Sequence, residues 1–142
     1  ASLERPVKLM IALEMIGYYD STPGSQDYPS PAMSWLYPDR GDFIAVVGRM
    51  QDINAVRQVK AALLSSRDLS VYSMNAPGFI PGVDFSDHLN YWQHDIPAVM
   101  ITDTAFYRNK QYHLPGDIAD RLNYQKMAQV VDGVTTLLYN SK

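Results

Sequence analysis

The sequence contains no cysteine among its 142 residues. A disulfide and a thiolate metal ligand are therefore excluded, and any bound metal ion must be held by His, Asp, Glu or water. The longest apolar runs are far too short for a membrane span. A signal-peptide apolar region is also missing from the N-terminus. The net charge of −3 gives no electrostatic reason to expect nucleic acid or an anionic membrane surface as a partner.

The residues that are present favour one α/β domain spanning 1–142. Hydrophobic residues make up 46% of the chain, enough to bury a modest core, and strand and helix patterns alternate along it. The patterns predict strands at residues 7–18, 42–48, 70–74 and 98–102. They predict helices at residues 53–66, 87–93 and 124–139, with Asp52, Ser86 and Asn123 as the respective N-caps.

A long connection separates the first two predicted strands. Residues 20–41 are rich in Pro, Ser, Gly and Tyr. This segment has 22 residues, which is more than a simple connection between two strands needs. Connections longer than about 12–15 residues are commonly functional loops. We therefore expect this segment to form the rim of a site.

The chemistry-bearing side chains concentrate in residues 86–124. This stretch reads SDHLNYWQHDIPAVMITDTAFYRNKQYHLPGDIADRLNY and holds all three histidines of the chain. A second notable segment is VKLMIALEMIG, residues 7–17, an apolar run with one acid, Glu14, near its end. A central parallel strand carrying a functional carboxylate has this appearance.

Together these segments resemble the C-terminal half of the dinuclear zinc exopeptidases, the family of aminopeptidase Y and bacterial leucyl aminopeptidase. The resemblance rests on the strand ending in Glu14, the SDH segment, the IPA strand and the late His-x-x-x-Asp that begins at His113. It implies a partial three-layer sandwich whose mixed, mostly parallel sheet is flanked by helices. It also implies two zinc ions as cofactors, with Glu14 a ligand to one and His113 a ligand to the other. Tyr112 takes the catalytic role of oxyanion donor.

Six more residues are candidates for substrate binding or for support of the ligands. Several of them could instead have a purely structural function. Arg108 could form a surface ion pair, Asp117 could be an ordinary turn residue, Asp103 could cap the turn after its strand, and an aromatic side chain could simply pack. His94 and Asp95, by contrast, are expected in a solvated turn. The six candidates are Asp87, His88, Asp103, Tyr107, Arg108 and Asp117.

The family's upstream ligands and its Glu-Glu pair have no match here. We therefore interpret the chain as the C-terminal portion of a larger peptidase catalytic domain that acts on peptides. A catalytic zinc normally has three protein ligands, so the chain alone should bind zinc weakly and be inactive. Its first strand should pair with the missing N-terminal portion or with another copy of the chain. The resemblance slightly favours a periplasmic or secreted location.

Two other functions are compatible with the same resemblance. Glutaminyl cyclases share the fold but use one zinc and a more enclosed aromatic pocket. Receptor ectodomains of this fold have lost the metals and act as noncatalytic binding modules. Retention of Glu14 and His113 weighs against the second alternative.

Overall fold

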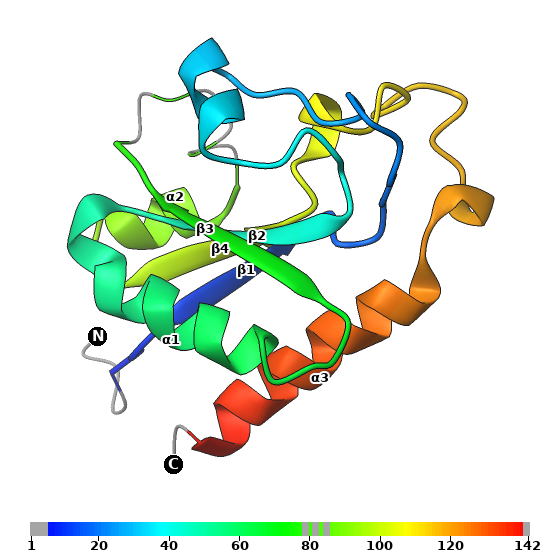
Figure 1. Cartoon of the computed structure of the whole chain (residues 1–142). Helices are drawn as coiled ribbons and strands as arrows, with labels where there is room; N and C mark the ends of the chain where they lie inside the picture. The colour runs from blue at the N-terminus through cyan, green and yellow to red at the C-terminus, as the bar shows by residue number, and fades with distance from the viewer. Residues whose placement is uncertain (1–5, 78–79, 81–82, 84–85, 141–142) are drawn as a thin grey trace.

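Four strands form one mixed sheet in the computed structural model, which describes residues 6–77, 80, 83 and 86–140. Across the sheet the order is β1 (Met10–Glu14), β4 (Ala98–Thr102), β2 (Phe43–Gly48) and β3 (Ser70–Asn75). β1 is parallel to β4 and β2 is parallel to β3, whereas β2 and β4 are antiparallel. The predicted fold class, a mixed and mostly parallel sheet flanked by helices, is confirmed (Figure 1).

Helices cover both faces of the sheet. α1 (Ile53–Leu63) and α3 (Tyr124–Asn140) pack against each other on one face, and α2 (His88–Trp92) packs against β4 and β1. Short 3₁₀ turns occupy Pro31–Trp35, Met50–Asp52, Ala105–Tyr107 and Ala119–Arg121. No helix in the described ranges has the length and hydropathy needed to cross a bilayer.

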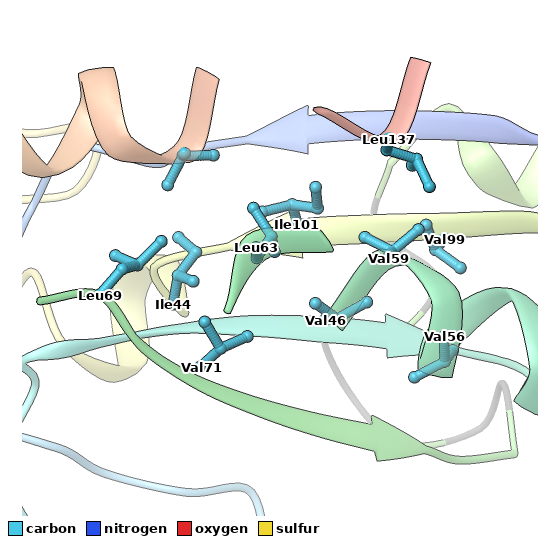
Figure 2. Close-up of a cluster of buried hydrophobic side chains, with 11 residues drawn as sticks. Ile44, Val46, Val56, Val59, Leu63, Leu69, Val71, Val99, Ile101 and Leu137 are labelled. Carbon is cyan, nitrogen blue, oxygen red and sulfur yellow. The ribbon is translucent and has the colours of Figure 1, made fainter. Parts of the chain in front are cut away.

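The core is divided into two clusters by β2, all six of whose residues are buried. Successive side chains on a strand point to opposite faces. Ile44 and Val46 therefore meet α1, β4 and α3 on one side, as Figure 2 shows, while Phe43, Ala45 and Val47 pack beside Trp92 and Met100 on the other. A strand buried on both faces accounts for the continuous apolar run FIAVV.

Several element boundaries differ from the predicted ones. β1 was predicted over residues 7–18 but ends at Glu14, because Met15 adopts a φ of 46° that a strand does not allow. α1 ends at Leu63 rather than at residue 66. β3, β4 and α3 match their predictions to within one residue. β1 also lies at an edge of the described sheet rather than at its centre.

Asn123 caps α3 through its side chain, Asp52 holds the predicted N-cap position of α1 without a side-chain cap hydrogen bond, and the prediction of Ser86 as the N-cap of α2 is wrong. The Asn123 side chain accepts a hydrogen bond from the Lys126 backbone N–H at 3.0 Å. Asp52 occupies the N-cap position of α1, but its carboxylate instead binds Arg49 Nε at 2.7 Å. Ser86 does not cap α2, since its hydroxyl donates to the Glu14 carboxylate at 2.9 Å.

Candidate functional site

A pocket of about 120 Å³ opens where the parallel strands β1 and β4 end. Glu14 at the end of β1 and Met15 just after it line the pocket, as do Thr102 at the end of β4 and Thr104 and Ala105 in the following loop. The rest of the wall comes from the 26–37 segment, from sheet residues beneath it, and from Val83, Ser86, Phe106, Tyr107 and Tyr112. The loop predicted to form a rim does so. Ligand sites in α/β sheets gather at the carboxyl ends of strands, which makes this pocket the candidate site.

Seven aromatic residues line the pocket. Burial raises the pKa of Tyr28 to about 12 and also raises the pKa values of Tyr37 and Tyr107. These phenols therefore stay neutral at physiological pH. The Tyr28 hydroxyl donates to the Pro38 carbonyl at 2.6 Å, and the Tyr37 hydroxyl donates to the Ser73 carbonyl at 3.0 Å. The aromatic residues that line the pocket are Tyr28, Tyr37, Phe43, Tyr72, Phe106, Tyr107 and Tyr112.

Glu14 supplies the unpaired carboxylate of this apolar pocket. The other lining carboxylate, Asp27, forms an ion pair with Lys110. Within the described residues Glu14 has no ion-pair partner, and its Oε1 accepts the Ser86 hydroxyl at 2.9 Å. An apolar wall with a carboxylate at one end suits a ligand that has an apolar body and a cationic group.

The backbone is strained around this pocket. Positive φ values occur at Met15 (46°), Thr104 (75°) and Ala105 (50°), all of which line it, and at His113 (60°), which follows the lining residue Tyr112. Such conformations cost on the order of 1–3 kcal/mol each and cluster at functional sites. Two other non-glycine residues with positive φ, Asp68 and Asp95, lie away from the pocket, so four of the six in the described part of the chain are at or beside it, which supports this location independently of any family resemblance.

Asp103 holds two of the strained segments together. Its carboxylate accepts hydrogen bonds from the backbone N–H groups of Gly17 and Tyr18, at 3.0 and 2.8 Å, and from Ala105 at 3.0 Å. Its own N–H donates to the Met15 carbonyl at 2.7 Å. The side chain is 2% exposed, and burial raises its pKa although the three donors act in the opposite direction. Asp103 thus caps the turn after β4 and does not line the pocket.

Arg108 is buried beneath the rim rather than displayed at the surface. Only 3% of it is exposed, and burial lowers its pKa. Its Nε donates to Gln26 Oε1 at 2.9 Å, and its Nη1 donates to the carbonyls of Tyr18 and Phe43 at 3.0 and 2.9 Å. Both expectations for this residue, a fork onto a substrate carboxylate and a surface ion pair, are therefore wrong.

Gln26 connects Arg108 to other residues of the pocket wall through hydrogen bonds. The Gln26 amide donates to Thr104 Oγ1 at 2.9 Å and to the Asp27 carbonyl at 2.8 Å. The Asp27 N–H in turn donates to the Tyr107 carbonyl at 2.8 Å. These contacts fix the rim loop against the loop after β4, so that both pocket walls share one buried support.

Tyr112 and His113 lie next to each other on the loop after β4. Tyr112 lines the pocket together with Glu14. The exposed His113 ring stacks on the Tyr112 ring, with 3.9 Å between the ring centroids and an interplanar angle of 19°. Exposed Asp117 accepts the Asn109 side-chain amide at 2.8 Å, and Asn109 also accepts Arg121 at 3.0 Å. Asp117 therefore orders this loop, which is one of the two functions expected of it.

Asp87 and His88 lie outside the pocket lining. Asp87 is exposed at the start of α2. His88 is fully buried, its ring stands edge-on to Trp92 with 4.4 Å between centroids, and its Nε2 lies 2.6 Å from the Val83 carbonyl. Neither residue lines the pocket, but His88 contacts the carbonyl of the lining residue Val83, and a supporting function for Asp87 and His88 stays a prediction. His94 and Asp95 lie in an exposed turn, as expected.

The donor set of the described residues is too small for a zinc site. No group of three His, Asp or Glu side chains in residues 6–77, 80, 83 and 86–140 is placed to hold a metal ion. Glu14 contributes one carboxylate and His113 one exposed imidazole. A catalytic zinc needs about three protein ligands, so these residues alone do not fit the metal.

Sequence reasoning missed several residues of the site. Ser86 was assigned to a helix cap, and nothing in its local pattern indicated a contact with Glu14, 72 positions away. Gln26 lies in a loop without periodicity. The positive φ values of Met15, Thr104 and Ala105 carry no sequence signal, because these residue types rarely adopt them.

Comparisons with known proteins show the fold. No family model matches the chain. It is 93% identical over all 142 residues to the uncharacterized protein YfbL of Escherichia coli K12, and it spans 44% of that protein's length.

Three similar solved structures come from Legionella pneumophila. One is LapA, with a TM-score of 0.64 and 20% identity over 93% of this chain and 31% of that one. A second structure, of the LapA aminopeptidase, has a TM-score of 0.62 and 20% sequence identity, and the match covers 94% of this chain and 31% of that one. LapB has a TM-score of 0.65 and 16% sequence identity, and the match covers 94% of this chain and 31% of that one. The chain therefore has an aminopeptidase-like fold.

Proposed function

We propose that this chain is part of a zinc-dependent aminopeptidase-type hydrolase, which removes N-terminal residues from peptides and whose two-zinc site is completed by the rest of a longer polypeptide. The observation that carries the proposal is the position of Glu14, an unpaired carboxylate within an aromatic pocket at the carboxyl ends of β1 and β4. The aminopeptidase-like fold supports it. The 44% share of the longer relative leaves room for the other ligands and a general base.

In this proposal the chain's own side chains bind and orient the substrate. The aromatic wall receives the apolar side chain of the N-terminal residue. Glu14 and His113 contribute one donor each to the metal site, and the Tyr112 hydroxyl is directed at the oxyanion that develops on the scissile carbonyl. No zinc chemistry is assigned to the chain alone, because its described residues contain no complete ligand set.

The test compares the longer polypeptide with this chain. We expect the longer protein to contain about two zinc ions and to hydrolyse aminoacyl anilides in a chelator-sensitive reaction. This chain alone should do neither. Glu14→Ala and His113→Ala in the longer protein should each lower its zinc content. His94→Ala is the matched control, because this exposed turn histidine lies outside the pocket.

Other results would assign a different function. A longer protein with neither zinc nor hydrolytic activity would refute the proposal and favour a noncatalytic binding module. Cyclisation of N-terminal glutamine with one zinc per chain would favour a glutaminyl cyclase. The periplasmic or secreted location stays a prediction, which cell fractionation of the longer protein tests.

A further inference from the structure

β1 presents an open edge of the sheet. It pairs with β4 on one side and, among the described residues, with nothing on the other. The Met10 N–H donates to the Pro97 carbonyl at 2.9 Å. Because successive peptide groups alternate in direction along a strand, the backbone groups of Ile11 and Leu13 face the open edge.

Nothing in β1 protects this edge. Strand edges are commonly guarded by proline, lysine or a bulge, and the sequence MIALE contains no proline and no lysine. It pairs with β4 in unbroken register from Met10 to Glu14. Leu13 is 46% exposed. An apolar, regular edge of this kind is a site for strand addition.

α3 presents a second apolar surface on its flank away from α1. Gly133 faces α1, since a Cβ built on it would lie 2.8 Å from Leu63 Cα. Tyr124, Val131 and Leu138 recur every seven residues, and at 3.6 residues per turn Val131 lies about 160° round the helix from Gly133. These three side chains are 51–63% exposed, Val131 the least and Leu138 the most.

The two surfaces lie on the same side of the molecule. α1 packs against β2 and β3, whereas the core cluster places Val130 and Leu137 of α3 with β4 residues and with Ile11 of β1. In Figure 1, α1 and α3 lie side by side across the face of the sheet. The free flank of α3 therefore borders the open edge of β1. We define the β1–α3 surface by Ile11, Leu13, Tyr124, Val131 and Leu138.

We propose that the β1–α3 surface docks a strand and an adjoining apolar helix from the rest of the longer polypeptide, so that the sheet and its helix layer both continue past β1. The chain spans 44% of the length of its 93% identical relative, so more than half of that protein is available to cover the surface. A strand alone would satisfy the Ile11 and Leu13 backbone groups and leave the α3 stripe exposed. An α/β unit covers both.

Amide exchange and thiol labelling test this docking in the longer polypeptide and in this chain alone. In the longer protein we expect the Ile11 and Leu13 amides to exchange at least about tenfold more slowly than in the lone chain. Because the chain has no cysteine, Val131→Cys introduces its sole thiol. That thiol should react with a maleimide at least about tenfold more slowly in the longer protein.

Leu64→Cys is the matched control, since Leu64 is 54% exposed, against 51% for Val131, at the end of α1. Its labelling rate should be the same in both proteins. Equal exchange at Ile11 and Leu13 in the two proteins would overturn the proposal. So would concentration-dependent protection of these amides in the lone chain, because it would assign the surface to a second copy.

Discussion

Arg108 offers the most direct test of how the pocket is supported. Its guanidinium is buried without an ion-pair partner among the described residues. Instead it donates to Gln26 and to the Tyr18 and Phe43 carbonyls, and it lies 4.6 Å from the centre of the Phe43 ring. Its Nη2 has no hydrogen-bond partner within the part of the chain that the structure describes. Replacing Arg108 by Met keeps most of the volume and removes the charge and the donors.

The free energy of unfolding should fall by about 3 kcal/mol in Arg108→Met. Each buried acceptor left without a donor costs about 1–3 kcal/mol. The Tyr18 and Phe43 carbonyls lose the Arg108 donor, whereas Gln26 Oε1 still accepts the Thr104 hydroxyl at 3.1 Å. Against this, the variant avoids desolvating a cation, a penalty of several kcal/mol in folded proteins. Arg108→Lys keeps the charge but loses the planar fork, so we expect an intermediate loss of about 1–2 kcal/mol.

Urea denaturation followed by tryptophan fluorescence measures this change, because Trp92 is only 7% exposed in the folded state. Arg40→Met is the control: Arg40 is exposed in the same rim loop and should change the free energy of unfolding by no more than about 0.5 kcal/mol. An Arg108→Met variant as stable as the parent would refute the reasoning, because it would show that the desolvation cost cancels the hydrogen bonds.

Three further changes have defined outcomes. Asn123→Ala removes the cap on Lys126 N–H and should cost about 1 kcal/mol in urea denaturation. Gly133→Ala places a Cβ 2.8 Å from Leu63 Cα and should lower the thermal midpoint through a cost of about 1–3 kcal/mol. Burial raises the pKa of Asp103 above its ordinary value of 3.8. Between 3.8 and the raised pKa the folded state therefore binds more protons than the unfolded state, and the free energy of unfolding contributed by Asp103 falls as the pH rises through this range. Asp103→Asn should flatten this part of the stability profile measured by denaturation at successive pH values.

The fold was predictable because its elements carry strong local patterns. β2 and β4 are short apolar runs buried on both faces, and α1 and α3 repeat apolar residues at helical spacing. Boundaries failed where a single backbone angle decided them. β1 stops at Glu14 because Met15 takes a positive φ, while its side-chain pattern continues through Ile16.

The candidate site was predictable only in part. Glu14, Tyr107 and Tyr112 were singled out from the sequence and all line the pocket. Ser86 and Arg108 were misassigned because their contacts are long-range: Ser86 meets Glu14 across 72 positions, and Arg108 meets Tyr18 across 90. Local patterns carry no information about such partners.

The polar residues of this chain divide by location. Two carboxylates, Glu14 and Asp27, line the pocket, and Glu14 is the one without an ion pair in the described residues. Asp103 and Arg108 are buried beneath the pocket. Asp103 accepts hydrogen bonds from backbone N–H groups, and Arg108 donates to backbone carbonyls, of the segments next to the lining residues. Buried charges are costly, and strained backbone persists only where its surroundings hold it. The scaffold beneath the pocket therefore explains why Met15, Thr104 and Ala105 keep conformations that their own sequences disfavour.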